Sequence, residues 1–177
     1  ISLDGLTTLS EPVARSRVGF LQEHDSIYLP NLEDLTPDVA QVVASGTHYL
    51  YLTGLKQITN EVAEILASQK GESLSLDSLS ELSDQAAYLL SKYEGSLSFN
   101  GITELSDVAA EHLGEHRGGL SLYGLESLSE TAASHLSTGQ GDLGMHLGEG
   151  GLSGSVADIL RSHPSFSDEE EEDNYDE

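Results

Sequence analysis

The chain of 177 residues is long enough for one domain with a continuous core, and its composition is strongly acidic. It contains 31 Asp and Glu residues against 7 Lys and Arg residues, a formal net charge of −24 at pH 7. This charge repels phosphate groups, so we expect no nucleic-acid partner, and it disfavours anionic membranes. A protein with a basic surface, a cation or a neutral glycan remains compatible with it.

The absence of cysteine excludes disulfides and thiolate chemistry but does not fix the compartment. No apolar run approaches the roughly 18 residues of a membrane span, so we expect no membrane insertion. No signal peptide is visible, and Ile1 already falls in a predicted strand, so we expect a processed or excised chain. The compartment stays open, with a secreted or cell-surface location slightly favoured.

A repeated unit of about 23 residues runs through the chain. Each unit opens with alternating apolar and polar residues, which predict a strand, and continues with apolar residues at helical spacing. The units start, in chain order, at Ile1, Ile27, Leu50, Leu74, Leu97, Leu120 and Leu143. A single unit buries too little apolar surface to fold alone, so we predict that about seven strand-turn-helix units stack on one another.

The first unit is irregular, with Pro12, Arg15 and Arg17 in its predicted helix. No capping unit precedes Ile1, although solenoids normally close their ends. We therefore expect the solenoid to extend further in the N-terminal direction. Its exposed strand edge would allow self-association through the N-terminal end.

Each middle unit carries signals for the start and the end of its helix. A hydroxyl residue precedes the helix, where it can accept a free backbone N–H, and Asp84, Asp107 and Glu130 follow it, where negative charge suits the helix dipole. The predicted caps are Thr36, Thr59, Ser83, Ser106 and Ser129. Glycines recur before the next strands, and we expect them to end the helices in a left-handed turn. These glycines are Gly71, Gly95, Gly118 and Gly141.

Alternation within the strands separates a core face from an exposed face. Leu74 and Leu76 are predicted to point inward, and Ser75 and Asp77 outward. The predicted core ladder consists of Leu3, Leu29, Leu52, Leu76, Phe99, Leu122 and Met145.

The last unit, residues 143–166, is degenerate, and we expect it to act as a cap with Phe166 covering the core. The solenoid domain is therefore predicted to span residues 1–166. In residues 167–177, eight of the eleven positions are acidic and none is basic. This tail has almost nothing to bury and its charges repel, so we predict that it is disordered.

The unit L-x-L-x-G-L-x-x-L-S-x-x-A-A-x-x-L resembles the leucine-rich repeat superfamily over residues 1–163. It is most similar to the short bacterial repeats of the surface-antigen type. The segment Ile27, Leu29 and Pro30 of this chain matches the opening of their pattern. Most units here are one residue shorter between strand and helix, and they lack the Phe that follows the alanine. The Asn ladder of typical leucine-rich repeats is also missing. The resemblance implies an α/β repeat solenoid with a parallel sheet on one face, short helices on the other, and binding at the exposed sheet.

The candidate binding residues occupy exposed strand positions of that sheet. Tyr28 and Tyr51 are neighbours in adjacent strands with Tyr49 nearby, and exposed tyrosines offer a large contact area with a polar tip. A structural interpretation stays open, because cross-strand aromatic pairs also stabilise sheets. The predicted binding residues are Tyr28, Tyr49, Tyr51, Asp77, Asn100 and Tyr123.

The sequence favours neither a metal site nor catalysis. His112 and His116 are four residues apart on a predicted helix, a spacing that can share zinc, but no HExxH motif surrounds them. We interpret them as exposed, solvated histidines. No EF-hand loop, nucleophile elbow or phosphate loop is present, so we expect no cofactor and no enzyme activity.

Two functions remain. The first is a non-enzymatic recognition module whose exposed sheet binds a protein, one with a basic surface for example, or a glycan. The second is a structural subunit of a filament or larger assembly, which stacks end to end or docks through its acidic tail.

Overall fold

The computed structural model of the chain describes residues 2–22, 25–45 and 47–166, and for residues 17–22 it describes the backbone alone. The predictions made for Ile1 and for the acidic tail, residues 167–177, lie outside the described residues.

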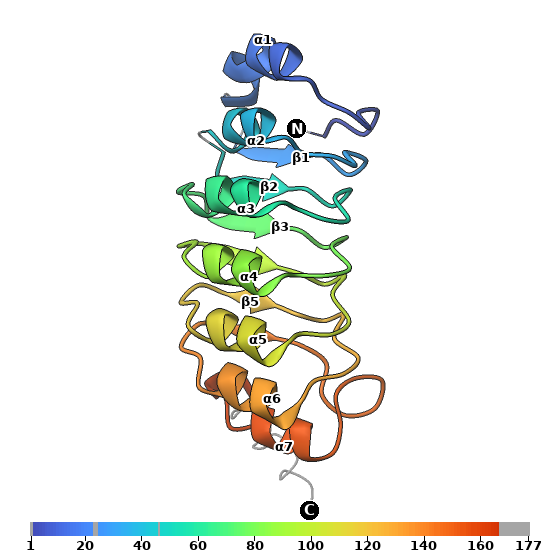
Figure 1. Ribbon diagram of the computed structural model, residues 1–177, viewed down its shortest axis with the longest axis vertical. Helices are drawn as coiled ribbons and strands as arrows, with labels where there is room; N and C mark the ends of the chain where they lie inside the picture. The colour runs from blue at the N-terminus through green and yellow to red at the C-terminus, as the bar shows by residue number, and fades with distance from the viewer. Residues whose placement is uncertain (1, 23–24, 46, 167–177) are drawn as a thin grey trace, which may run out of the picture.

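Short strands and helices alternate along the described chain and stack along one axis, with the helices in one layer and the strands in another (Figure 1). The strands are β1 Ser26–Tyr28, β2 Tyr49–Tyr51, β3 Ser73–Ser75, β4 Ser96–Ser98, β5 Leu120–Ser121 and β6 Leu143–Gly144. The helices are α1 Glu11–Gln22, α2 Pro37–Ala44, α3 Asn60–Ala67, α4 Asp84–Leu90, α5 Asp107–Gly114, α6 Glu130–Ser137 and α7 Ser155–Leu160.

The described strands form a six-stranded parallel sheet in the order β1 to β6. This confirms an α/β architecture in which a parallel sheet alternates with helices in a solenoid-like arrangement. The sheet has one strand fewer than predicted. Ser2 forms only an isolated bridge with Tyr28, and the Leu3 N–H donates to the Tyr28 carbonyl at 3.0 Å. The first predicted strand is thus reduced to a short segment along the edge of β1.

The pairing register aligns like residues and produces the predicted core ladder. Leu50 pairs with Leu74, and Leu97 with Leu120, so each strand places a leucine beside that of its neighbour. The inward residue that directly follows each strand is buried, from Leu29 after β1 to Met145 after β6. Leu3, at the N-terminal end of this ladder, is half-buried. At the other end Phe166 packs against the core. Among the described residues, no helix is both long and apolar enough to cross a membrane.

The predicted helix caps are confirmed. Each cap hydroxyl accepts the backbone N–H three residues later, from 3.4 Å at Thr36 to 3.0 Å at Ser106 and Ser129. The same hydroxyl of Ser106 donates to Asp84 of the preceding helix at 2.5 Å, and that of Ser129 donates to Asp107. The caps therefore connect neighbouring units as well as starting the helices.

The prediction for the recurring glycines is wrong. Helices α3 to α5 end at Ser68, Ser91 and Glu115 in right-handed conformations. None of the four glycines has a positive φ; among the described residues, positive φ values belong to Gly148, Gly150 and Gly154. The glycines are required instead by close stacking of backbones. A Cβ atom would lie 2.5 Å from the Gly71 carbonyl oxygen at Gly95, 2.1 Å from the Gly95 oxygen at Gly118, and 2.0 Å from the Gly118 oxygen at Gly141.

Candidate functional site

The sheet face opposite the helices presents three columns of side chains, because the parallel strands pair in register. The first column contains Ser26, Tyr49, Ser73 and Ser96, and it continues to Gly119 and Asp142 before β5 and β6. The second contains Tyr28, Tyr51, Ser75, Ser98, Ser121 and Gly144. The third, just after the strands, includes Asp77, Asn100, Tyr123 and His146.

Tyr28 and Tyr51 form a stacked aromatic pair across β1 and β2. Their ring centroids are 4.2 Å apart and the rings are 3° from parallel. Tyr28 is 40% exposed and Tyr51 is half-buried. Burial, followed by the neighbouring Tyr28 hydroxyl, raises the pKa of Tyr51, so Tyr51 is uncharged at neutral pH. Because the rings are stacked, each ring covers one face of the other, and the two hydroxyl groups lie close together.

Tyr49 does not join this stack. Its hydroxyl donates to the Glu72 carboxylate, whose other oxygen lies 3.1 Å from Nδ1 of His48. These hydrogen bonds from Tyr49 and His48 lower the pKa of Glu72, and the bond to Glu72 raises the pKa of Tyr49. The predicted tyrosine cluster is therefore divided into an aromatic pair and a separate polar group around Glu72.

Asp77 and Asn100 are adjacent in the stack, as predicted, but their polar atoms bind neighbouring units. Asp77 accepts from the hydroxyls of Ser75 and Ser98, at 2.8 and 2.5 Å, and from the backbone N–H of Asn100 at 3.0 Å. Asn100 repeats the arrangement one unit later: it accepts from Ser121 and from the backbone N–H of Tyr123. These two residues hold successive units together, and their internal hydrogen bonds account for their place in the repeat.

This network also explains why one outward prediction is wrong. Ser75 was expected to face solvent, yet it is only 3% exposed. Its hydroxyl is turned towards Asp77, which removes it from the accessible face. Strand alternation gives the side of the sheet, whereas burial depends on the neighbouring side chains.

Tyr123 stands at the opposite end of the sheet from the stacked pair. It is 48% exposed, and its ring is tilted against His146 with centroids 4.8 Å apart. The ring also lies over β6, because a Cβ atom at Gly144 would be 3.0 Å from the Tyr123 hydroxyl oxygen.

A shallow hollow of about 370 Å³ lies on the sheet beside Tyr123. Small residues in β3 to β6, or directly before β5, form much of its lining, including Ser73, Ser96, Ser98, Ser121, Gly119 and Gly144. Asp142 lines it too, and its side chain is exposed. The sequence analysis included none of these serines among the predicted binding residues and did not predict the hollow. The sequence feature that could have indicated the hollow is the pair Gly119 and Gly144, which occupy positions where other units carry larger side chains.

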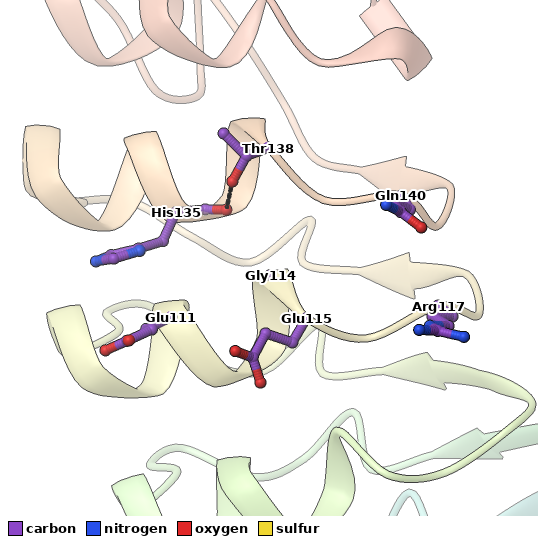
Figure 2. A pocket seen from close by; sticks show the side chains of 7 residues that line it. All are labelled: Glu111, Gly114, Glu115, Arg117, His135, Thr138 and Gln140. Carbon is purple, nitrogen blue, oxygen red and sulfur yellow. Dashed lines mark hydrogen bonds between the residues drawn. The ribbon is translucent and has the colours of Figure 1, made fainter.

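A second hollow, of about 530 Å³, lies on the helical side between α5 and α6. Figure 2 shows Glu111 and His135 on neighbouring helices at one end, and Arg117 and Gln140 at the other. One unit earlier, Tyr88 occupies the position of Glu111; its ring contacts His112 and lies beneath the Lys92 ammonium, 3.7 Å from the ring centroid. The hollow therefore opens where the smaller Glu111 replaces an aromatic ring.

The prediction of an exposed His116 is wrong. The side chain is 3% exposed, with Nδ1 at 3.2 Å from the Ser91 carbonyl oxygen and a buried Nε2 that has no partner. Gly139 follows one unit later at the same position, and His163 occupies it in the last unit. The two histidines and Gly139 line a cavity of about 10 Å³, roughly the space for one water molecule.

Comparison of the chain with protein-family models, with curated proteins and with solved structures gave no match. Within the described ranges, no group of three or more His, Asp or Glu side chains is arranged to hold a metal ion.

Proposed function

We propose that this protein is a non-enzymatic recognition module that binds a macromolecular partner on the exposed face of its parallel sheet. The observation that carries the proposal is the arrangement of exposed aromatic residues on that face. The Tyr28–Tyr51 stack lies at one end and Tyr123 at the other, with the serine- and glycine-lined hollow extending towards the stack from Tyr123.

The chemistry of this face suits recognition. Tyrosine gives a large, rigid contact area at low conformational-entropy cost, and its hydroxyl can bond to a polar partner. The small residues between the aromatic groups leave room for a partner to approach the sheet, and Ser96 is exposed there. The repeat pattern in the sequence resembles the leucine-rich repeat superfamily, in which this face is the usual binding surface.

The test uses two probe collections, a phage-displayed library of random linear peptides and a glycan array. Ligands selected on the unmodified protein are then measured against a Tyr28→Ser, Tyr51→Ser, Tyr123→Ser triple variant. Truncating interface tyrosines removes contacts that each contribute about 1 kcal/mol or more, so we expect affinity to fall by more than about fivefold.

The matched control is Tyr88→Ser on α4, because Tyr88 and Tyr28 are both 40% exposed. The control is expected to bind as the unmodified protein does, and circular dichroism establishes that all variants fold. Selected ligands that bind the triple variant with unchanged affinity would contradict the proposal.

A further inference from the structure

Charge and shape at the hollow indicate which kind of partner it fits. We propose that the hollow beside Tyr123 takes an extended, basic segment of a partner protein, whose Lys or Arg side chains pair with Asp142 and Glu72. This inference rests on the proposed function and names the chemistry of the partner.

The size of the hollow fits a short piece of extended chain. Its lining reaches from Ser73 on β3 to Gly144 on β6, which is three strand spacings, or roughly 14 Å. An extended chain of about four residues spans this length. Because serine and glycine residues form much of the lining, a peptide backbone can approach the sheet closely and meet the hydroxyl of exposed Ser96.

One carboxylate, that of Asp142, lines the hollow, and a second, that of Glu72, belongs to the residue just before the lining residue Ser73. Asp142 lines the end at β6, and it makes no ion pair with any part of the chain that the structure describes. Glu72 immediately precedes Ser73 at the β3 end, with its side chain 58% exposed. Hydrogen bonds from Tyr49 and His48 hold the Glu72 carboxylate in place, and they lower its pKa.

Positive charge is absent from the residues that line the hollow. The Lys92 ammonium lies over Tyr88 of α4, Arg117 lines the hollow on the helical side, and Arg161 pairs with Asp158 of α7. Asp142 is therefore left for an external cation, whereas Glu72 already bonds to Tyr49 and His48 and keeps a largely exposed side chain. The net charge of −24 adds a long-range attraction that speeds the approach of a basic segment.

The Tyr123 ring provides a second contact for a cation. Its exposed surface forms a wall of the hollow, and aromatic faces attract Lys and Arg side chains. A neutral glycan also stacks on tyrosine and its hydroxyls can donate to a carboxylate, but it gains no attraction from the net charge of −24. The observations therefore favour a basic peptide segment over a glycan.

The experiment measures fluorescence anisotropy with two dye-labelled peptides of equal length, one of alternating Arg and Ser and one of alternating Gln and Ser. The unmodified protein is compared with an Asp142→Asn, Glu72→Gln variant. A control variant, Glu104→Gln with Glu126→Gln, changes two exposed carboxylates elsewhere and so has the same net charge. Because Glu72 has internal partners, Asp142→Asn alone is measured too.

We expect the Arg-Ser peptide to bind in preference to the Gln-Ser peptide. The variant at the hollow should lose about tenfold in affinity, Asp142→Asn alone about threefold, and the control less than about twofold. The loss should shrink as salt concentration rises, because exposed charges are screened.

Three results would overturn the inference. Equal losses in the hollow and control variants would mean that the peptide responds only to the net charge. Ligands from the library or the glycan array that depend on the tyrosines but not on Asp142 would overturn the basic partner and leave the proposed function standing. Failure of every probe to bind would count against both.

Discussion

At the scale of single residues, glycine has a different role here from the one its position before a strand indicates. The glycine column allows the backbones of successive units to approach more closely than any side chain permits, as at Gly118 against Gly95. A recurring glycine in the sequence shows that the position requires glycine. It does not show the reason, because a positive φ and a close approach of two backbones both require it. Only the position of the neighbouring unit distinguishes them.

Gly118→Ala should therefore destabilise the protein strongly. Its Cβ would lie 2.1 Å from the Gly95 carbonyl oxygen, so the stacked backbone has to move, which costs about 1–3 kcal/mol. Gly5→Ala is the control, since a Cβ there meets no atom within 4 Å. Urea denaturation measures both, and equal midpoints for the two variants would refute close packing as the cause.

His163 should make the stability of the C-terminal end depend on pH. Burial lowers the pKa of His163 below its ordinary value, although Asp142 partly opposes this. The unfolded chain then binds the proton more readily than the folded chain. The contribution of His163 to the free energy of unfolding is full above about pH 6.5 and is lost as pH falls through the folded-state pKa.

The measurement is urea denaturation at about pH 8 and about pH 5 for the unmodified protein and for His163→Gln. The unmodified protein should lose more stability between the two pH values than the variant does, because the common effects of the other groups cancel in the comparison. Exposed His146, changed to Gln, is the control and should keep the full pH dependence. Identical pH dependence in all three proteins would contradict a role for burial.

At the scale of elements, the short helices are held by caps that also bond to the preceding unit. Ser106 accepts the Ala109 N–H at 3.0 Å and donates to Asp84 at 2.5 Å. A helix of about eight residues has little stability by itself, so its cap and its packing decide whether it forms. Hydroxyl residues before the helices were predictable because a cap is a local requirement. The bond to the preceding unit was not predictable, because it joins residues 22 positions apart.

Ser106→Ala should lower the free energy of unfolding by about 1–2 kcal/mol, since it removes a helix cap. In a double-mutant cycle with Asp84→Ala, we expect a coupling energy of at least about 0.5 kcal/mol, because the two side chains share a hydrogen bond. Thr36→Ala is a comparison, with its longer capping bond of 3.4 Å to Val39. Strictly additive effects of the Ser106 and Asp84 substitutions would show that the bond between units contributes nothing.

At the scale of the whole molecule, both ends of the described sheet are partly covered. Residues 2–3 pair along the edge of β1. At the other end, the Leu143 N–H donates to the Ser165 hydroxyl at 2.9 Å, and Phe166 packs on the core. With a net charge of −24, copies of this chain also repel one another.

We therefore expect this chain to remain monomeric at low salt. A recognition module can act as a monomer, whereas a subunit that stacks end to end must self-associate. Sedimentation equilibrium over a wide range of protein concentrations measures this directly. A mass that rises with concentration at low salt would favour the structural-subunit function instead. Repeating the measurement at high salt tests whether charge repulsion keeps the copies apart.

The sequence by itself determined the order of the elements, the starts of the helices and the inward leucines. These follow from periodicity and capping, which act within a few neighbouring residues. It also placed Tyr28, Tyr51 and Tyr123 on one face of the sheet. Only the tertiary structure decided that Ser75 and His116 are buried, that Asp77 and Asn100 bond to the next unit, and that a hollow lies beside Tyr123. The physical reason is that each of these features depends on side chains about one repeat away. The residue pattern within a single unit does not specify how those side chains are placed.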